Sequence, residues 1–182
     1  GKSFYRHHFK FGANSEAAIY FVSKQQEQTT SFSHTHFQYE IAQDARIKIF
    51  KLQDTAQNHF DFNEDRAQQA AKSHFEINTL TLDGSFVRND TMVAVQGEHA
   101  QTYLNGAYWL KEEQHVANYT TIDHQVANCE SFETYKGVAA DRSTAVFNGK
   151  VFVRKDAQKT NAYQSNKNIL ISENASANTK PQ

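Results

Sequence analysis

Short runs of strand-forming residues, most of them ended by a turn signal, recur along this chain and constrain its fold more than any other feature. Such runs lie at residues 77–82, 92–95, 101–104, 145–147 and 150–153. Turn signals follow at Asp83-Gly84, near Gly97, at Asn105-Gly106 and at Asn148-Gly149, and the last predicts a tight turn between two strands. Helical signals are weak, because residues 67–72 have a helix-forming composition but no amphipathic stripe. The sequence therefore predicts an all-β chain.

The spacing of these runs leaves two β architectures open. Strand centres recur roughly every 10–16 residues, which suits a sandwich or a barrel. The chain has 1 Pro and 7 Gly, few for so many tight reversals, whereas its 14 Asn and 16 Gln suit a solenoid whose side-chain amides stack from coil to coil. No exact repeat is visible, so the pattern favours neither a sandwich nor a β-helix. Residues 47–52 change their apolar face midway, which predicts a bend or corner.

Composition narrows the class of protein. A chain of 182 residues is long enough for one domain with a core, although only 38% of its residues are apolar. A net charge of −1 argues against binding to nucleic acid or an anionic membrane. Its apolar runs fall far short of the ~20 residues of a membrane-spanning helix, and its start does not resemble a signal peptide. The single cysteine excludes an internal disulfide, so we expect a soluble, cytoplasmic domain.

The candidate metal ligands and nucleophiles are isolated from one another. His34 and His36 would share one face of a strand, but a zinc site needs three or four ligands, so a solvated strand face is the preferred interpretation. Cys129 could carry sulfur or bind metal as a thiolate, but a lone cysteine is more often a small, inert, buried side chain. Asp123 and His124 are adjacent and would point to opposite faces of a strand, so they are interpreted as structural.

Enzymatic signatures are equally sparse. Asp61, Glu64 and Asp65 could be the carboxylates of a polysaccharide lyase or glycosidase, but they lie in a local polar run that we interpret as an exposed turn. The glycines never approach the spacing of a phosphate-binding P-loop. We therefore predict no catalytic residue and no metal ligand.

The last segment, residues 157–182, is polar except for an apolar run at residues 169–171, which predicts a short strand. The chain stops soon afterwards, at Pro181 and Gln182, with no closing helix. This pattern suggests a piece of a longer protein.

Several stretches, taken together, resemble one known family. They are Gly84 with Arg88-Asn89-Asp90, Gly97-Glu98 with Ala100, Leu104-Asn105-Gly106 with Tyr108, the run from His115 to His124, Cys129 with Ser131, Tyr135-Lys136-Gly137-Val138, Phe147-Asn148-Gly149-Lys150-Val151, and residues 157–182. Their order and spacing resemble the SufB/SufD family of iron–sulfur cluster assembly proteins. Gln158-Lys159-Thr160 and the final Thr179-Lys180-Pro181-Gln182 are similar to the SufD branch. The resemblance is strongest from residue 84 to residue 182.

This resemblance implies a right-handed parallel β-helix that forms a single domain over residues 1–182, without the family's N-terminal region or its C-terminal helical region. It also implies a scaffold subunit that is not an enzyme and that pairs with SufB and SufC, while the Fe–S cluster resides on the assembled complex. We expect no cofactor on these residues and no nucleic acid or membrane partner. A homodimer stays open as an alternative assembly. The family's cluster-proximal histidine has no counterpart among the nine histidines, and Cys129 matches a family cysteine in position only.

The polar segment before the last apolar run is the predicted partner interface. Its candidate residues are Lys159, Asn161, Gln164, Asn166, Lys167 and Asn168. The competing interpretation is that these amides form internal ladders between coils. Two alternative functions stay open: a carbohydrate-active β-helix enzyme, and a structural β-solenoid interaction module without cluster chemistry.

Overall fold

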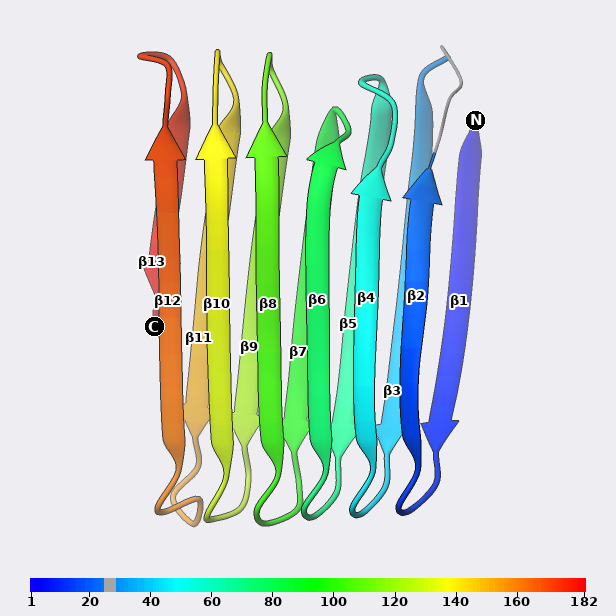
Figure 1. Ribbon diagram of the computed structural model, residues 1–182, viewed down its shortest axis with the longest axis vertical. Helices are drawn as coiled ribbons and strands as arrows, with labels where there is room; N and C mark the ends of the chain where they lie inside the picture. The colour runs from blue at the N-terminus through cyan, green and yellow to red at the C-terminus, as the bar shows by residue number, and fades with distance from the viewer. Residues whose placement is uncertain (25–28) are drawn as a thin grey trace.

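The computed structural model describes residues 1–24 and 29–182, and this part of the chain consists of strands and turns without a helix (Figure 1). The strands are β1 (Lys2–Phe11), β2 (Glu16–Lys24), β3 (Ser31–Ile41), β4 (Arg46–Asp54), β5 (His59–Gln69), β6 (His74–Asp83), β7 (Phe86–Val95), β8 (Gln101–Leu110), β9 (His115–His124), β10 (Glu130–Ala139), β11 (Thr144–Val153), β12 (Asn161–Leu170) and β13 (Ser176–Pro181). The prediction of an all-β chain is confirmed. Within the described residues, no helix could cross a membrane.

The strands form two parallel sheets that face each other. The seven odd-numbered strands make one sheet and the six even-numbered strands the other, each in chain order. In Figure 1 the even strands run upward in front, the odd strands run downward behind, and the chain advances from right to left, which makes the coil right-handed. The molecule is therefore a parallel β-solenoid in a single domain. This settles the choice between sandwich and β-helix and confirms the fold that the family resemblance implied.

The coils differ in length, which hides the repeat in the sequence. Phe60 pairs with Phe86, 26 positions later, whereas Thr144 pairs with Ser176, 32 positions later. Because each turn absorbs the difference, the strands stay in register while the period drifts. A search for one fixed period therefore finds none.

The turns need little glycine because other residues adopt the left-handed conformation. Asn14, Asp44 and Lys72 have φ of 58°, 58° and 56°. The backbone N–H of each donates to a carbonyl in the next coil's turn, for example from Asp44 to Ala71 at 3.1 Å. These bonds offset a conformational cost on the order of 1 kcal/mol per residue. The scarcity of Gly and Pro is therefore compatible with many reversals.

Two predicted turns are wrong. Asn105-Gly106 lies inside β8 and Asn148-Gly149 inside β11. These glycines make room for a side chain of the next coil, because a Cβ on Gly106 would lie 2.2 Å from the Tyr135 ring. Asp83-Gly84 is a true turn, with Gly84 at φ 130°. The strand predicted at residues 101–104 belongs to the longer β8, and the one predicted at residues 169–171 overlaps the end of β12, which stops at Leu170.

The predicted bend at residues 47–52 is also wrong. β4 pairs continuously with β2 over its whole length, although the apolar residues do change face. Ile49 is buried inside the solenoid, and Lys51 follows it inward while Leu52 faces outward. The change reflects a switch from an apolar to a polar interior along a regular strand.

Candidate functional site: a polar interior and the outer face of the six-stranded sheet

The carboxylates interpreted as an exposed turn lie in β5, and two of them are inside the solenoid. The alternation of β5 turns Asp61 and Asp65 inward, where they are 1% and 2% exposed. Glu64 faces outward and pairs with His36 at 3.1 Å, which lowers its pKa. The prediction failed because local polarity in a strand does not reveal which face is solvated.

A buried ion pair joins the two sheets. The Lys51 ammonium donates to Asp65 Oδ1 and lies 3.7 Å from the centre of the Phe37 ring. The Tyr39 hydroxyl donates to the same carboxylate oxygen at 3.1 Å. Burial lowers the pKa of Lys51, opposed by the attraction of Asp65, and burial raises the pKa of Tyr39. Because Lys51 and Tyr39 both donate to Asp65, these three side chains form a noncovalent crosslink between the two sheets.

Amide side chains continue this polar interior toward the C-terminal coils. Gln53 donates to Asn89 at 2.8 Å, and Asn89 donates to Asn118 at 3.0 Å in the next coil of the sheet. Glu133 accepts hydrogen bonds from the Thr120 hydroxyl at 2.7 Å and from the Gln164 side-chain amide at 2.9 Å. Its other oxygen, Oε1, has no partner within the described residues. Burial raises the pKa of Glu133. The predicted stacking of amides between coils is confirmed.

The candidate metal and thiol residues do not assemble a centre. Within residues 1–24 and 29–182, no three His, Cys, Asp or Glu side chains are grouped so that they could hold a metal ion. His34 contacts the edge of the Phe4 ring, at 6.4 Å between centroids. Cys129 is fully buried, with Sγ 3.4 Å from the Gly97 carbonyl, and burial raises the pKa of its thiol. Such a thiol stays protonated and is a poor nucleophile.

Asp123 and His124 have separate partners, as the structural interpretation predicted. Arg154 donates to both Asp123 oxygens, at 2.7 and 3.0 Å, which lowers the pKa of that carboxyl. The His124 ring contacts Ser131 Oγ at 2.9 Å, and burial lowers the pKa of His124. Asp123 thus connects β9 to the residue that follows β11, and His124 connects β9 to β10.

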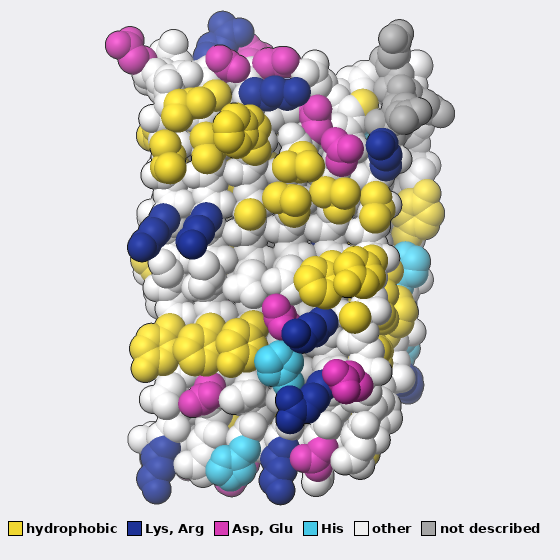
Figure 2. All heavy atoms as spheres, viewed as in Figure 1, with side chains coloured by type: hydrophobic (Ala, Val, Ile, Leu, Met, Phe, Trp, Pro, Cys, Tyr) yellow, Lys and Arg dark blue, Asp and Glu magenta, His cyan; other side chains and the backbone are white. Residues whose placement is uncertain are grey.

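The outer face of the six-stranded sheet carries rows of hydrophobic side chains (Figure 2). Because the strands are parallel and in register, equivalent outward positions line up across them. We call one line the central row: Val22, Leu52, Leu80, Ala107, Lys136 and Lys167. A second line is the aromatic row of Tyr103, Phe132 and Tyr163, whose rings stack at 5.0 and 5.2 Å.

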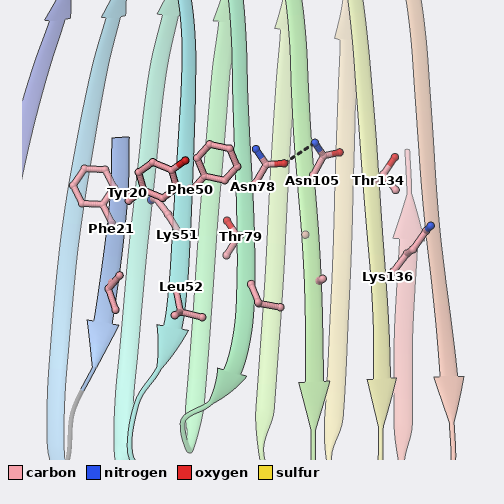
Figure 3. A pocket seen from close by; sticks show the side chains of 14 residues that line it. Tyr20, Phe21, Phe50, Lys51, Leu52, Asn78, Thr79, Asn105, Thr134 and Lys136 are labelled. Atoms are coloured by element: carbon pink, nitrogen blue, oxygen red, sulfur yellow. Dashed lines mark hydrogen bonds between the residues drawn. The ribbon is translucent and has the colours of Figure 1, made fainter. Parts of the chain in front are cut away.

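A groove of about 550 Å³ lies beside the central row (Figure 3). The rings of Tyr20 and Phe50 stack at 4.8 Å at one end, and Lys136 lies at the other. Between them, Asn105 donates to Asn78 at 3.0 Å. The groove is therefore apolar over β2 and β4 and becomes polar and cationic toward β10. Sequence reasoning missed it because its residues become neighbours only through coil-to-coil register.

The predicted interface residues lie on or just before β12, the last strand of the six-stranded sheet. Lys159 is in the preceding turn at φ 58°, and Asn161 and Lys167 are exposed. The other three serve the interior: Gln164 donates to Glu133, and Asn168 accepts from Tyr108 and donates to Asn166. Half of the predicted set thus faces solvent, and the other half forms the internal ladder of the competing interpretation.

Comparison with known proteins gives one consistent answer. The whole chain, residues 1–182, matches the family model described as SUF system FeS cluster assembly, SufBD core domain. It is 27% identical to the iron–sulfur cluster assembly protein SufD of Escherichia coli, over 98% of this chain and 42% of that protein. Iron–sulfur cluster assembly SufBD family proteins of Synechocystis and Mycobacterium tuberculosis are 24% and 26% identical, over 86% and 75% of this chain. The chain spans 34% to 42% of the length of these relatives.

Proposed function

The chain belongs to the SufBD core family of the SUF iron–sulfur cluster assembly system, and we propose that it is a SufD-type scaffold subunit. In this role it pairs with SufB and SufC, and the complex builds nascent Fe–S clusters and transfers them in the cytoplasm. The observation that carries the proposal is the family match over residues 1–182. Similarity to the Escherichia coli SufD protein over 98% of the chain supports the SufD type.

The chemistry of the described residues supports a scaffold over a carbohydrate-active enzyme. A glycosidase needs two carboxylates facing each other across an open groove, whereas Asp61 and Asp65 are buried and Glu64 is paired with His36. The alternative is therefore not favoured.

The cluster is proposed as cargo of the assembled complex, with no cofactor resident on this chain. Cys129 supports this, because its thiol is buried and its raised pKa disfavours the thiolate that iron requires. Anaerobic reconstitution of the isolated protein should give no stoichiometric visible absorbance. An absorbance band that disappears in Cys129→Ser would overturn this part of the proposal.

The cellular role is tested by removing the protein from its own organism. Depletion should lower the activity of Fe–S enzymes such as aconitase and the incorporation of labelled iron into them, while their protein levels stay constant. Re-expression of the full-length protein should restore both. Unchanged iron incorporation after depletion, in cells without a second assembly system, would contradict the proposed function.

A further inference from the structure

One surface goes beyond the proposed iron–sulfur role. We propose that the central row and its groove bind an amphipathic α-helix of a partner protein, with the apolar face of the helix over β2 to β8 and its carboxylates over β10 and β12. The apolar part of the row is open to solvent, since Val22 is 62% exposed and Leu80 41%. Figure 2 shows this face with its hydrophobic side chains gathered in rows.

The charge of the occupant follows from the cationic end of the row. Lys136 and Lys167 are direct partners in the register of β10 and β12, and both are exposed. Like charges directly opposite each other on neighbouring strands are destabilising. On the same face Lys48 has the carboxylate of Glu76 at 3.6 Å, whereas Lys136 and Lys167 have no ion-pair partner among the described residues. Carboxylates on the occupant would relieve this repulsion.

The backbone of the sheet decides that the occupant is a helix. The groove lies over β2 to β10, and of these strands β4 to β10 lie between hydrogen-bonded neighbours on both sides, while β2 is the edge strand of the sheet. A bound extended strand would find no backbone partner on this face, whereas a helix satisfies its own N–H and C=O groups.

The length of the row sets the length of that helix. It crosses six strands, or five strand spacings of about 4.8 Å, which makes about 24 Å. At 1.5 Å per residue, a helix of about 16 residues spans this distance. Its turns recur every 5.4 Å, so each turn meets about one strand. Apolar residues at i, i+4, i+7 and i+11 would meet the aliphatic side chains, and two carboxylates in the last turn would meet the lysines.

The test uses the full-length protein and a synthetic helical peptide of that design, with Leu at the four apolar positions and two Glu in the last turn. Fluorescence anisotropy should show saturable binding. Lys136→Glu with Lys167→Glu should weaken binding about tenfold, because two attractions become two repulsions. A second peptide with Lys in place of Glu should show the reverse preference. Lys150→Glu, an exposed lysine on β11 in the opposite sheet, is the matched control and should leave binding unchanged.

Each other outcome overturns the proposal. No saturable binding to the folded wild-type protein means that another segment or nothing occupies the groove. Equal binding of both peptides to the wild-type and double-variant proteins would show that Lys136 and Lys167 do not select carboxylates on the bound helix. Concentration-dependent dimerisation in sedimentation velocity, abolished by Leu52→Asp, would instead assign the groove to a second copy. None of these measurements requires SufB or SufC. A negative result would therefore contradict the helix-binding proposal without contradicting the proposed iron–sulfur role.

Discussion

At the scale of single residues, the solenoid interior is held by polar side chains that satisfy one another across the two sheets. Lys51, Tyr39 and Asp65 form one such group, and Gln53 with Asn89 forms another. Directional bonds of this kind fix the register between facing sheets more strictly than apolar packing does. Some buried polar atoms have no hydrogen-bond partner within the described residues, and one carboxylate oxygen of Glu133 is among them.

Glu133→Gln should therefore stabilise the protein at pH 8, by on the order of 1 kcal/mol. Burial raises the folded-state pKa of this acid above its ordinary 4.5. The penalty for the charged form is then absent below pH 4.5, where both folded and unfolded states are protonated. The free-energy penalty of burying the charged carboxylate grows as pH rises from 4.5 through the folded-state pKa of Glu133. Urea unfolding at several pH values should show a stability gap between variant and wild type that closes as pH falls toward 4.5.

The control for this experiment is Glu98→Gln, an exposed residue in the turn between β7 and β8. Its stability should track the wild type at every pH. A Glu133→Gln protein that is less stable than wild type at pH 8 would show that the buried charge contributes favourably.

At the scale of elements, the strands depend on a match between small and large side chains in adjacent coils. Gly106 of β8 faces the Tyr135 ring of β10, and Gly137 of β10 faces the Tyr108 ring of β8. Each tyrosine thus fills the space that a glycine leaves. This complementarity explains why β8 and β10 each contain a glycine in the middle of the strand and still pack tightly.

Gly106→Ala should destabilise the protein by about 1–3 kcal/mol, because its Cβ would lie 2.2 Å from the Tyr135 ring. Adding Tyr135→Leu should restore part of the loss by making room. Gly12→Ala is the control, since a Cβ there meets no atom within 4 Å. Chemical denaturation measures all four proteins, and an unaffected Gly106→Ala protein would contradict the packing.

The proposed role of β12 in partner pairing can be tested at its outer edge, where no other strand pairs with it among the described residues. The N–H of Asn161 donates to the Cys129 carbonyl, so the N–H of the next residue, Ala162, points away from β10. In the full-length protein, Ala162→Pro should remove one edge donor and weaken association with SufB severalfold, whereas Ala162→Thr keeps the donor and should bind normally. If both variants bind SufB as wild type does while remaining folded, the interface lies elsewhere.

The elements also show how far sequence reasoning reaches. The strand ending at Asp83-Gly84 was predicted, because Gly84 needs its positive φ for a purely local reason. Asn105-Gly106 has the same local signature, but glycine is needed there because the Tyr135 ring, 29 positions later, packs against it. No local sequence pattern reveals that contact. Asp65 was misplaced for a related reason: only the opposite sheet, with Lys51, makes the burial of its carboxylate favourable.

At the scale of the whole molecule, the outer faces of the sheets exist only once the coils are stacked. The central row combines residues from six strands. Because the coils differ in length, no fixed sequence spacing predicts which residues lie in the row. The family resemblance was visible in the sequence because it rests on short stretches in a fixed order, and the match over residues 1–182 confirms it. The rigid solenoid then offers long faces and strand edges to other chains.

The proposed role as a scaffold within a SUF complex can be tested by native mass spectrometry of the full-length protein, co-expressed with SufB and SufC of its own organism. We expect a single complex in which all three proteins are present. SufB and SufC that assemble with each other while this protein remains alone would contradict it.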